Sequence, residues 1–286
     1  MTARLSLAHS PCPNDTFVFH AWSHGLLPGA PPVAVSYADV DVTNTAAERA
    51  EYDVVKVSYA ALPWLLADYA LLPCGGALGR GCGPLVLTAA GPGGRARLRG
   101  RAGLRGRAGL RGARVAVPGN RTTAYLLFRL WSAGEPPARV DIVPFDRIMP
   151  AVADGRYDAG LVIHEARFTY PSYGLSCLAD LGDWWEAETG LPIPLGAILA
   201  RRSLDLPALA AVVRESVEYA WAHPDASAAY VAEHAQELAA QVQRQHIALY
   251  VNEFSRDLGA EGYAAAEALL GRAAVAGLTP PCPPLR

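Results

Sequence analysis

The chain has 286 residues, is 51% apolar, and carries 25 Lys and Arg against 27 Asp and Glu. Its length predicts about two domains, and this share of apolar residues excludes a disordered chain. Eight arginines lie in residues 94–114, which contain no acid, so the rest of the chain has 17 bases and 27 acids. Since phosphate contacts need a basic surface, we expect no nucleic-acid partner.

Targeting signals and cysteine motifs are missing from the sequence. The first 17 residues have no charged segment followed by an apolar stretch, as a signal peptide would. The most apolar region, 57–79, is interrupted by proline, aspartate and paired glycines, unlike a membrane span. The five cysteines are odd in number and lack C-x-x-C spacing, which predicts neither a disulfide framework nor a zinc site. We expect a cytoplasmic protein that does not insert into a membrane.

Short apolar runs alternate with helical patterns over the first 90 residues. We expect strands at 5–9, 33–37, 53–58, 70–73 and 85–89, and helices at 17–24, 43–51 and 60–66. Alternation of this kind predicts βαβ units and a largely parallel sheet that helices cover on both faces.

A repeated segment then interrupts the pattern. RAGLRG occurs at 101–106 and again at 107–112, after the partial copy RARLRG at 95–100. The segment 94–113 is interpreted either as a basic arm or as a repeat expansion in a tolerant loop. Because it is rich in glycine and has no aromatic residues, we favour the tolerant loop.

The second half starts another α/β block and then becomes helical. Strands are expected at 114–118, 140–144, 160–163 and 195–200, and helices at 122–133, 147–153, 206–222, 226–239, 242–251 and 261–276. The strand at 195–200 is expected to return to the first block. The prediction is an α/β fold of two lobes, 1–90 with 195–286 and 91–194, with a cleft for a small molecule between them.

Two candidate binding segments belong to the first lobe, one after an expected strand and one within another. Asn14 lies where a strand leads into a helix N-terminus, a place that suits an anion. Capping of this helix is the preferred role for Asp15 and an equal alternative for Asn14. Lys56 is the only lysine and lies in an apolar strand, so it indicates either an anion-binding ammonium or an ion pair with a carboxylate of the other lobe.

Two further candidates lie in the second lobe. Thr122 and Thr123 stand at a turn before a helix, where hydroxyl and backbone N–H groups suit an anionic group. A Thr N-cap without a ligand is the alternative. His164 ends a buried strand, and its near-neutral titration suits proton abstraction, although a lone histidine is more often structural. His9 has a similar position and a weaker case.

Eight segments together resemble the 1,4-dihydroxy-6-naphthoate synthases of the futalosine route to menaquinone. They cover nearly the whole chain in the order of that family. The segments are SPCPNDTF (10–17), KVSYAALP (56–63), LPCGGALGRGCGPL (72–85), VAVPGNRTTA (115–124), FDRIMPAV (145–152), IHEARFTY (163–170), DLGDWWEAETGLPIPLGAILARR (180–202) and the weaker YVNEFS (250–255).

The resemblance implies a two-lobed fold like the type II periplasmic binding proteins, used as a lyase without metal or organic cofactor. It implies an anionic small-molecule substrate, cyclic dehypoxanthine futalosine, and elimination to 1,4-dihydroxy-6-naphthoate with release of a sugar-derived fragment. His164 would be the catalytic base. Substrate would be bound by Lys56, Val57, Ser58, Thr122, Thr123 and Ala124, to which we add Asn14. The alternatives are a non-catalytic binding protein of the same fold and the related chorismate dehydratase.

Overall fold

The computed structural model describes residues 4–90, 109–235 and 239–286. It divides the chain into unit 1, Met1–Gly79 with Leu191–Arg286, and unit 2, Arg80–Gly190. We expected the first boundary after residue 90, but it falls after Gly79. The reason is that β6 (Leu85–Ala89) pairs with strands of unit 2 on both of its edges. The chain therefore leaves unit 1 earlier than its pattern of apolar runs indicated.

The sheet of unit 1 has the strand order β2-β1-β3-β11-β4, and β5 also pairs with β11. Strand β1 runs parallel to β2 and β3, whereas β11 runs antiparallel to β3, β4 and β5. The strands are β1 (Leu5–His9), β2 (Val33–Tyr37), β3 (Val54–Ser58), β4 (Tyr69–Leu71), β5 (Ala77–Gly79) and β11 (Ile193–Arg201). The prediction of a largely parallel sheet is wrong here, because the strand that returns to unit 1 runs antiparallel to all three of its neighbours.

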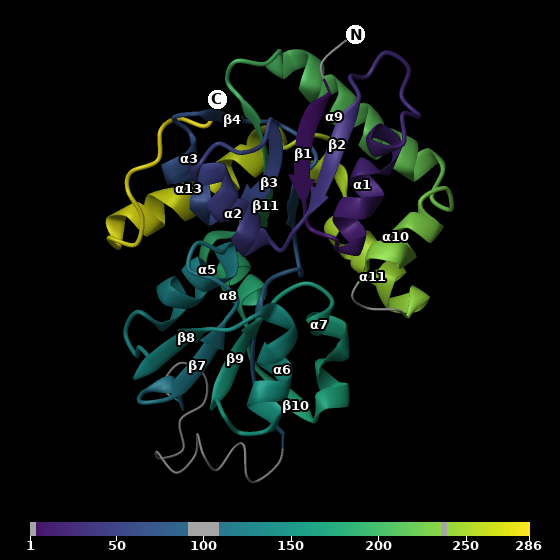
Figure 1. The fold of residues 1–286 in the computed structure, drawn as a ribbon. Coiled ribbons are helices and arrows are strands. Elements are labelled where there is room, and N and C mark those ends of the chain that lie inside the picture. Colours follow the sequence, from purple (N-terminus) through teal and green to yellow (C-terminus); the bar gives the residue numbers. More distant parts are fainter. Residues whose placement is uncertain (1–3, 91–108, 236–238) are drawn as a thin grey trace. The chain divides into compact units, whose positions relative to one another are not determined.

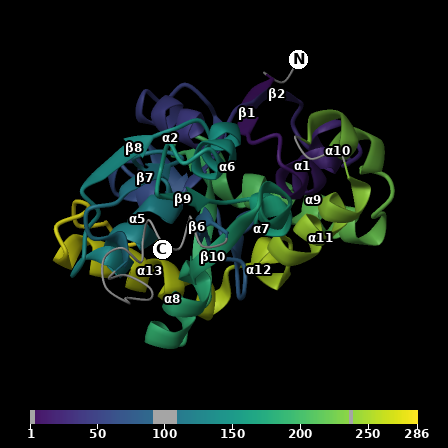
Figure 2. The same cartoon turned by 90° about the horizontal axis from the view of Figure 1, so that it is seen from below.

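Helices pack on this sheet in two groups. Helix α1 contacts α9, α10 and α11, and these helices lie together in Figures 1 and 2. Its residues Phe17 and Phe19 join Val213 of α9 in one apolar core. Helix α2 contacts β1 and β3, and α13 contacts β11. The helices of the unit are α1 (Pro13–Ser23), α2 (Val40–Glu48), α3 (Leu62–Leu65), α9 (Leu206–Ala222), α10 (Ala228–His234), α11 (Ala240–Tyr250), α12 (Glu253–Arg256) and α13 (Gly259–Val275), with the 3-10 helix η1 (Tyr59–Ala61).

The sheet of unit 2 has the order β10-β6-β9-β7-β8. Strand β7 is parallel to β8 and β9, and β6 is antiparallel to β9 and β10, so this sheet is mixed too. Helix α6 packs on β6, β7 and β9, and α5 contacts β9 and α8. The remaining elements are β7 (Arg114–Val117), β8 (Arg139–Ile142), β9 (Ala159–Val162), β10 (Leu175–Asp180), α5 (Thr123–Ser132), α6 (Phe145–Ala153), α7 (Ala166–Thr169), α8 (Leu181–Thr189) and η3 (Tyr170–Tyr173).

The Arg/Gly-rich segment 94–113 is described only from residue 109 onward. In that part Leu110 is 0% exposed and Ala113 is buried. Arg111 pairs with Pro137 in a β-bridge, and its side chain forms an ion pair with Glu135 at 2.7 Å. The expectation of a tolerant loop is therefore wrong for the end of the second RAGLRG copy, which is packed into unit 2. The part of the segment before residue 109 lies outside the described residues.

The α-helices in the described ranges are between 4 and 17 residues long. None of them is both long enough and apolar enough to cross a bilayer.

Candidate active site

In unit 1, the carboxyl ends of β1 and β3 carry the first group of candidate residues. These strands are parallel neighbours, so their carboxyl ends meet at the same edge of the sheet. Asp15, on the first turn of α1, accepts a hydrogen bond from Lys56 Nζ of β3 through its Oδ1 atom. Its Oδ2 atom accepts from the Ser10 hydroxyl at 2.7 Å and from the Ser10 backbone N–H at 3.3 Å. The sequence signal of a lone buried lysine thus leads to a buried ion pair.

Two expectations were wrong: that Asp15 caps α1, and that any ion-pair partner of Lys56 comes from the other lobe. No side chain caps α1, whose N-cap residue is Cys12, so Asp15 is not the cap. It is instead the partner of Lys56, and it belongs to the same unit and not to the other lobe. Burial by itself raises the pKa of Asp15, but Lys56, His9 and the hydrogen bond from Ser10 lower the pKa below its ordinary value. The carboxylate is therefore held in its charged form.

Asn14 is buried beside this ion pair. Its Nδ2 group donates to Asp15 Oδ1 at 2.7 Å, and its Oδ1 atom lies 2.9 Å from Nε2 of His246 on α11. Because the Asn14 amide oxygen is an acceptor, the His246 Nε2–H is the donor. Sequence reasoning missed His246, since a histidine within a helical pattern gives no sign of its partner 232 positions away.

Ser58, at the end of β3, is held by Asn44 of α2. The Ser58 backbone N–H donates to Asn44 Oδ1 at 2.8 Å, and Asn44 Nδ2 donates to the Ser58 hydroxyl at 3.2 Å. Between Lys56 and Ser58, Val57 is fully buried and pairs with Ala197 of β11. Nothing in the sequence pattern singled out Asn44. The three predicted binding residues 56–58 therefore stand on a strand with neighbours on both edges.

In unit 2, the predicted residues Thr122, Thr123 and Ala124 form the start of α5, and all three are buried. Thr122 is the N-cap, because its Oγ1 accepts from the Tyr125 N–H at 3.2 Å. The Thr122 hydroxyl also donates to the Gly119 carbonyl at 3.0 Å. The capping alternative is thus observed for Thr122. Thr123 and Ala124 occupy the first two helical positions, whose N–H groups have no acceptor within the helix.

His164 lies just after β9, in a backbone conformation that is rare for a residue other than glycine. Its φ angle is +54°, in the left-handed region, where histidine and asparagine are tolerated better than bulkier residues. Its ring forms a T-shaped pair with Phe145 of α6, with centroids 5.4 Å apart and planes at 87°. Strained backbone of this type concentrates at functional sites, which supports the prediction for His164.

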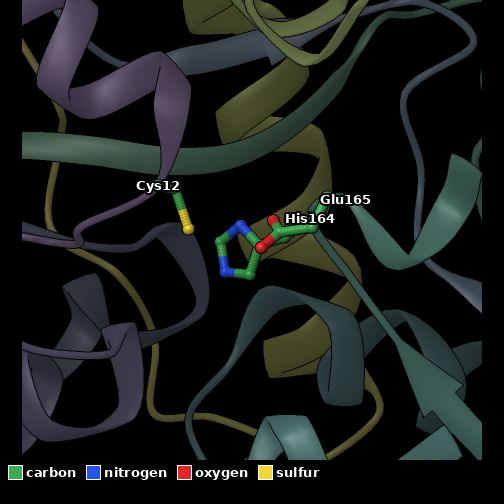
Figure 3. A group of neighbouring side chains, drawn as sticks. All are labelled: Cys12, His164 and Glu165. Atoms are coloured by element: carbon green, nitrogen blue, oxygen red, sulfur yellow. The ribbon is translucent and has the colours of Figure 1, made fainter. Parts of the chain in front are cut away.

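Glu165 follows His164 in sequence and is buried. One of its carboxylate oxygens lies within 4.8 Å of a His164 ring nitrogen, and Figure 3 shows both side chains on the segment between β9 and α7. Cys12, which Figure 3 also draws, belongs to unit 1. Within either unit alone, the described residues hold no group of three His, Cys, Asp or Glu side chains close enough to share a metal ion.

The segment after His164 is fastened by an ion pair of α7. Arg167 Nη2 lies 2.5 Å from Asp180 Oδ2 and donates to the Gly83 carbonyl at 2.9 Å. Asp180 in turn caps α8, because its Oδ1 accepts from the Gly182 N–H at 2.9 Å. A Cβ atom at Gly83 would come within 2.2 Å of the Gly182 backbone, so this approach requires glycine. The short helix after His164 is therefore tied to two other segments of unit 2.

Two α/β units, each built around one mixed sheet, define a periplasmic binding protein-like fold. The alkanesulfonate-binding protein SsuA of Xanthomonas axonopodis, solved with bound MOPS, superposes with a TM-score of 0.72 at 16% identity, covering 99% of this chain and 96% of that one. Protein AF1704 of Archaeoglobus fulgidus superposes with a TM-score of 0.85 at 34% identity, covering 96% and 98%. The predicted fold class is confirmed.

Sequence comparison narrows this class to a family. Residues 5–275 match the family described as Menaquinone biosynthesis, and the chain belongs to that family. It is 60% identical over 282 residues to a 1,4-dihydroxy-6-naphthoate synthase of Streptomyces coelicolor, covering 96% of this chain and 95% of the relative. It is 47% identical to a synthase of the same name from Thermus thermophilus, covering 98% and 97%. The resemblance stated from the motifs is confirmed, and the chain is an enzyme of this family.

Proposed function

We propose that this protein is a 1,4-dihydroxy-6-naphthoate synthase that acts on cyclic dehypoxanthine futalosine. The observation that carries the proposal is the near full-length identity of 60% with a relative of that name. The fold is compatible with it, because the alkanesulfonate-binding protein SsuA, which has this fold, binds a small anionic ligand. The substrate of the proposed reaction carries an aryl carboxylate.

His164 is assigned the role of general base. It takes a proton from a carbon of the substrate, and the electron pair left behind forms a double bond as the sugar-derived fragment departs. The product ring becomes aromatic, which supplies much of the driving force, and the reaction as proposed uses no cofactor. A general base contributes roughly 10²–10⁴-fold to the rate. The left-handed backbone at residue 164 supports this assignment, because strained backbone concentrates at functional sites, and the imidazole packs against the Phe145 ring.

Residues 56–58 and 122–124 are assigned to substrate binding, together with Asn14. Lys56 supplies an ammonium, Ser58 supplies a hydroxyl, and the start of α5 supplies backbone N–H groups at the positive end of a helix. These are the donors that a carboxylate and a polyhydroxylated ring require. We further propose that the protein works in the cytoplasm, where cell fractionation is expected to recover it.

Incubation of the wild-type protein with cyclic dehypoxanthine futalosine tests the function. Liquid chromatography with mass spectrometry is expected to detect 1,4-dihydroxy-6-naphthoate and a sugar-derived fragment in equal amounts. Binding of the substrate without any product would instead identify a non-catalytic binding protein of this fold. A parallel incubation with chorismate is the control, and its dehydration would identify the related chorismate dehydratase.

A further inference from the structure

The ion pair between Asp15 and Lys56 has a defined geometry, because further hydrogen bonds fix the orientation of the Asp15 carboxylate. Both carboxylate oxygens accept hydrogen bonds: Oδ2 accepts from Ser10, and Oδ1 accepts from Asn14 and Lys56. A carboxylate bonded at both oxygens cannot turn, so the direction in which it holds the lysine is set. Charge-assisted bonds of this kind are the strong ones among protein hydrogen bonds.

From this arrangement we propose that Asp15 is a positioning residue that orients the Lys56 ammonium for the substrate. The inference rests on the proposed function, which places Lys56 at the substrate. An ammonium has three N–H donors, and holding one of them on Asp15 fixes the directions of the other two. Asp15 thereby decides where Lys56 presents its donors, without itself reaching the substrate.

Asn14 is a further residue that holds the Asp15 carboxylate in place. Asn14 donates to Asp15 and accepts from His246, so the positioning network runs from α11 through the first turn of α1 to β3. His246 is 0% exposed. Because Asn14 is hydrogen-bonded to this buried histidine at one end of its amide and to Asp15 at the other, both ends of the amide take part in positioning.

The stem of Lys56 is guided by Gly196 of β11. A Cβ atom at Gly196 would lie 2.8 Å from Lys56 Cε and 3.8 Å from Lys56 Nζ. The lysine chain therefore passes over a neighbouring position that carries no side chain. Gly196→Ala would displace the ammonium while leaving both charges of the pair in place, so it separates position from charge.

Nuclear magnetic resonance can test the position of Lys56 directly, because the chain contains a single lysine. Labelling with ¹³C-lysine gives one Cε methylene signal that needs no assignment. In the wild type its two protons are expected to have different shifts, since a fixed side chain places them in different surroundings. Asp15→Asn and Gly196→Ala are each expected to merge or shift these two proton signals.

Asp53→Asn is the matched control. Asp53 is a second carboxylate of the same sheet and accepts from the Ser6 N–H and hydroxyl, both at 2.8 Å, but it does not contact Lys56. This variant is expected to leave the Lys56 signals unchanged. Retention of the wild-type splitting in both Asp15→Asn and Gly196→Ala would overturn the proposal. Should Asp15→Asn fail to fold, Ser10→Ala replaces it, because this variant frees one carboxylate oxygen of Asp15 from the Ser10 hydroxyl, and unchanged Lys56 signals in it would overturn the proposal.

Kinetics supply the second measurement. Asp15→Asn and Gly196→Ala are expected to raise KM by about tenfold or more while kcat changes by less than about threefold, as the loss of an aligned charged hydrogen bond predicts. A loss of about tenfold in kcat with an unchanged KM would contradict positioning of a binding group. If the wild type shows no turnover at all, the proposed function fails, and the resonance measurement still decides whether Asp15 orients Lys56.

Discussion

Asn44 and Ser58 form a reciprocal pair, in which each residue both donates and accepts. The Ser58 N–H donates to the Asn44 amide oxygen at 2.8 Å, and the Asn44 amide nitrogen donates to the Ser58 hydroxyl at 3.2 Å. Both residues are buried. The pair joins α2 to the end of β3, and it directs the hydroxyl hydrogen of Ser58 away from Asn44, since that hydroxyl oxygen is already an acceptor.

We expect Asn44→Ala to destabilise the fold by about 1–3 kcal/mol, because it leaves the buried Ser58 N–H without its acceptor. Chemical denaturation measures this change. Thr45→Ala, on the exposed side of the same helix, is the control and is expected to cost less than about 0.5 kcal/mol. Equal stability of the two variants would show that Asn44 does not hold Ser58.

Replacement of His164 separates its chemistry from its backbone. Asn tolerates the left-handed conformation at this position, so His164→Asn is expected to fold with a stability within about 1 kcal/mol of the wild type. Turnover of cyclic dehypoxanthine futalosine is expected to fall by at least about 10²-fold. Mass spectrometry of the product measures this loss, and full product formation would refute the general-base role.

Ala50 provides a control for backbone strain, since its φ angle is also +54°. Ala50→Gly is expected to stabilise the protein by up to about 1 kcal/mol without affecting turnover.

The repeated RAGLRG segment gives a prediction about packing. Leu110→Ala is expected to lower the free energy of unfolding by about 2–5 kcal/mol, because this leucine is completely buried. Deletion of residues 101–106 leaves the identical copy at 107–112 in place, and we expect it to change neither stability nor activity measurably. Thermal unfolding of the two variants side by side tests both expectations. A large loss from the deletion would assign the repeat a role of its own.

The buried His9 predicts how stability depends on pH. Burial lowers the pKa of His9 below its ordinary value of 6.5, and nearby Asp15 only partly offsets this effect. Below pH 6.5 the unfolded chain therefore takes up a proton that the folded chain resists, so stability falls as the pH falls. The slope is at most about 1.4 kcal/mol per pH unit for one such group.

We expect His9→Asn to reduce this slope between pH 6.5 and 5.5, because asparagine does not titrate. Its amide can still donate to the Ser10 carbonyl, which His9 Nδ1 contacts at 2.8 Å. Burial and His24 also lower the pKa of His20, which contributes with the same sign, so part of the slope should remain. Urea unfolding at several pH values measures it. An unchanged slope in His9→Asn would show that His9 does not drive the effect.

The elements of the fold were largely predictable from periodicity. The bounds of β1, β2, β6 and α9 agree with the expected ranges, because each of these segments is a clean apolar run or a long helical pattern. No element was expected at β10 and α8, because their residues 175–189 mix tryptophan, glycine and acids without a clear period. The expectation failed for strand direction, since an apolar run of five residues carries no information about whether its neighbour is parallel.

The partners within the site were less predictable than its members. The position of Lys56 in an apolar strand indicated that this lysine needs a partner. Only the folded chain identifies that partner as Asp15, 41 positions earlier. Likewise, Asn44 and His246 give no signal in sequence, because their significance comes from contacts over 14 and 232 positions. The roles predicted for residues 56–58, 122–124 and 164 remain predictions for the experiments above.

The placement of β11 has a consequence for how the chain folds during synthesis. Strand β11 stands between β3 and β4, and β4 and β5 pair with it alone among the described strands. All of unit 2 is translated before residue 191. On the ribosome, unit 2 can therefore be complete while the sheet of unit 1 still lacks its inner strand β11. One edge of β3 stays unpaired while more than a hundred further residues are translated. Since domains generally fold as units during translation, this inserted unit is expected to be the first to fold.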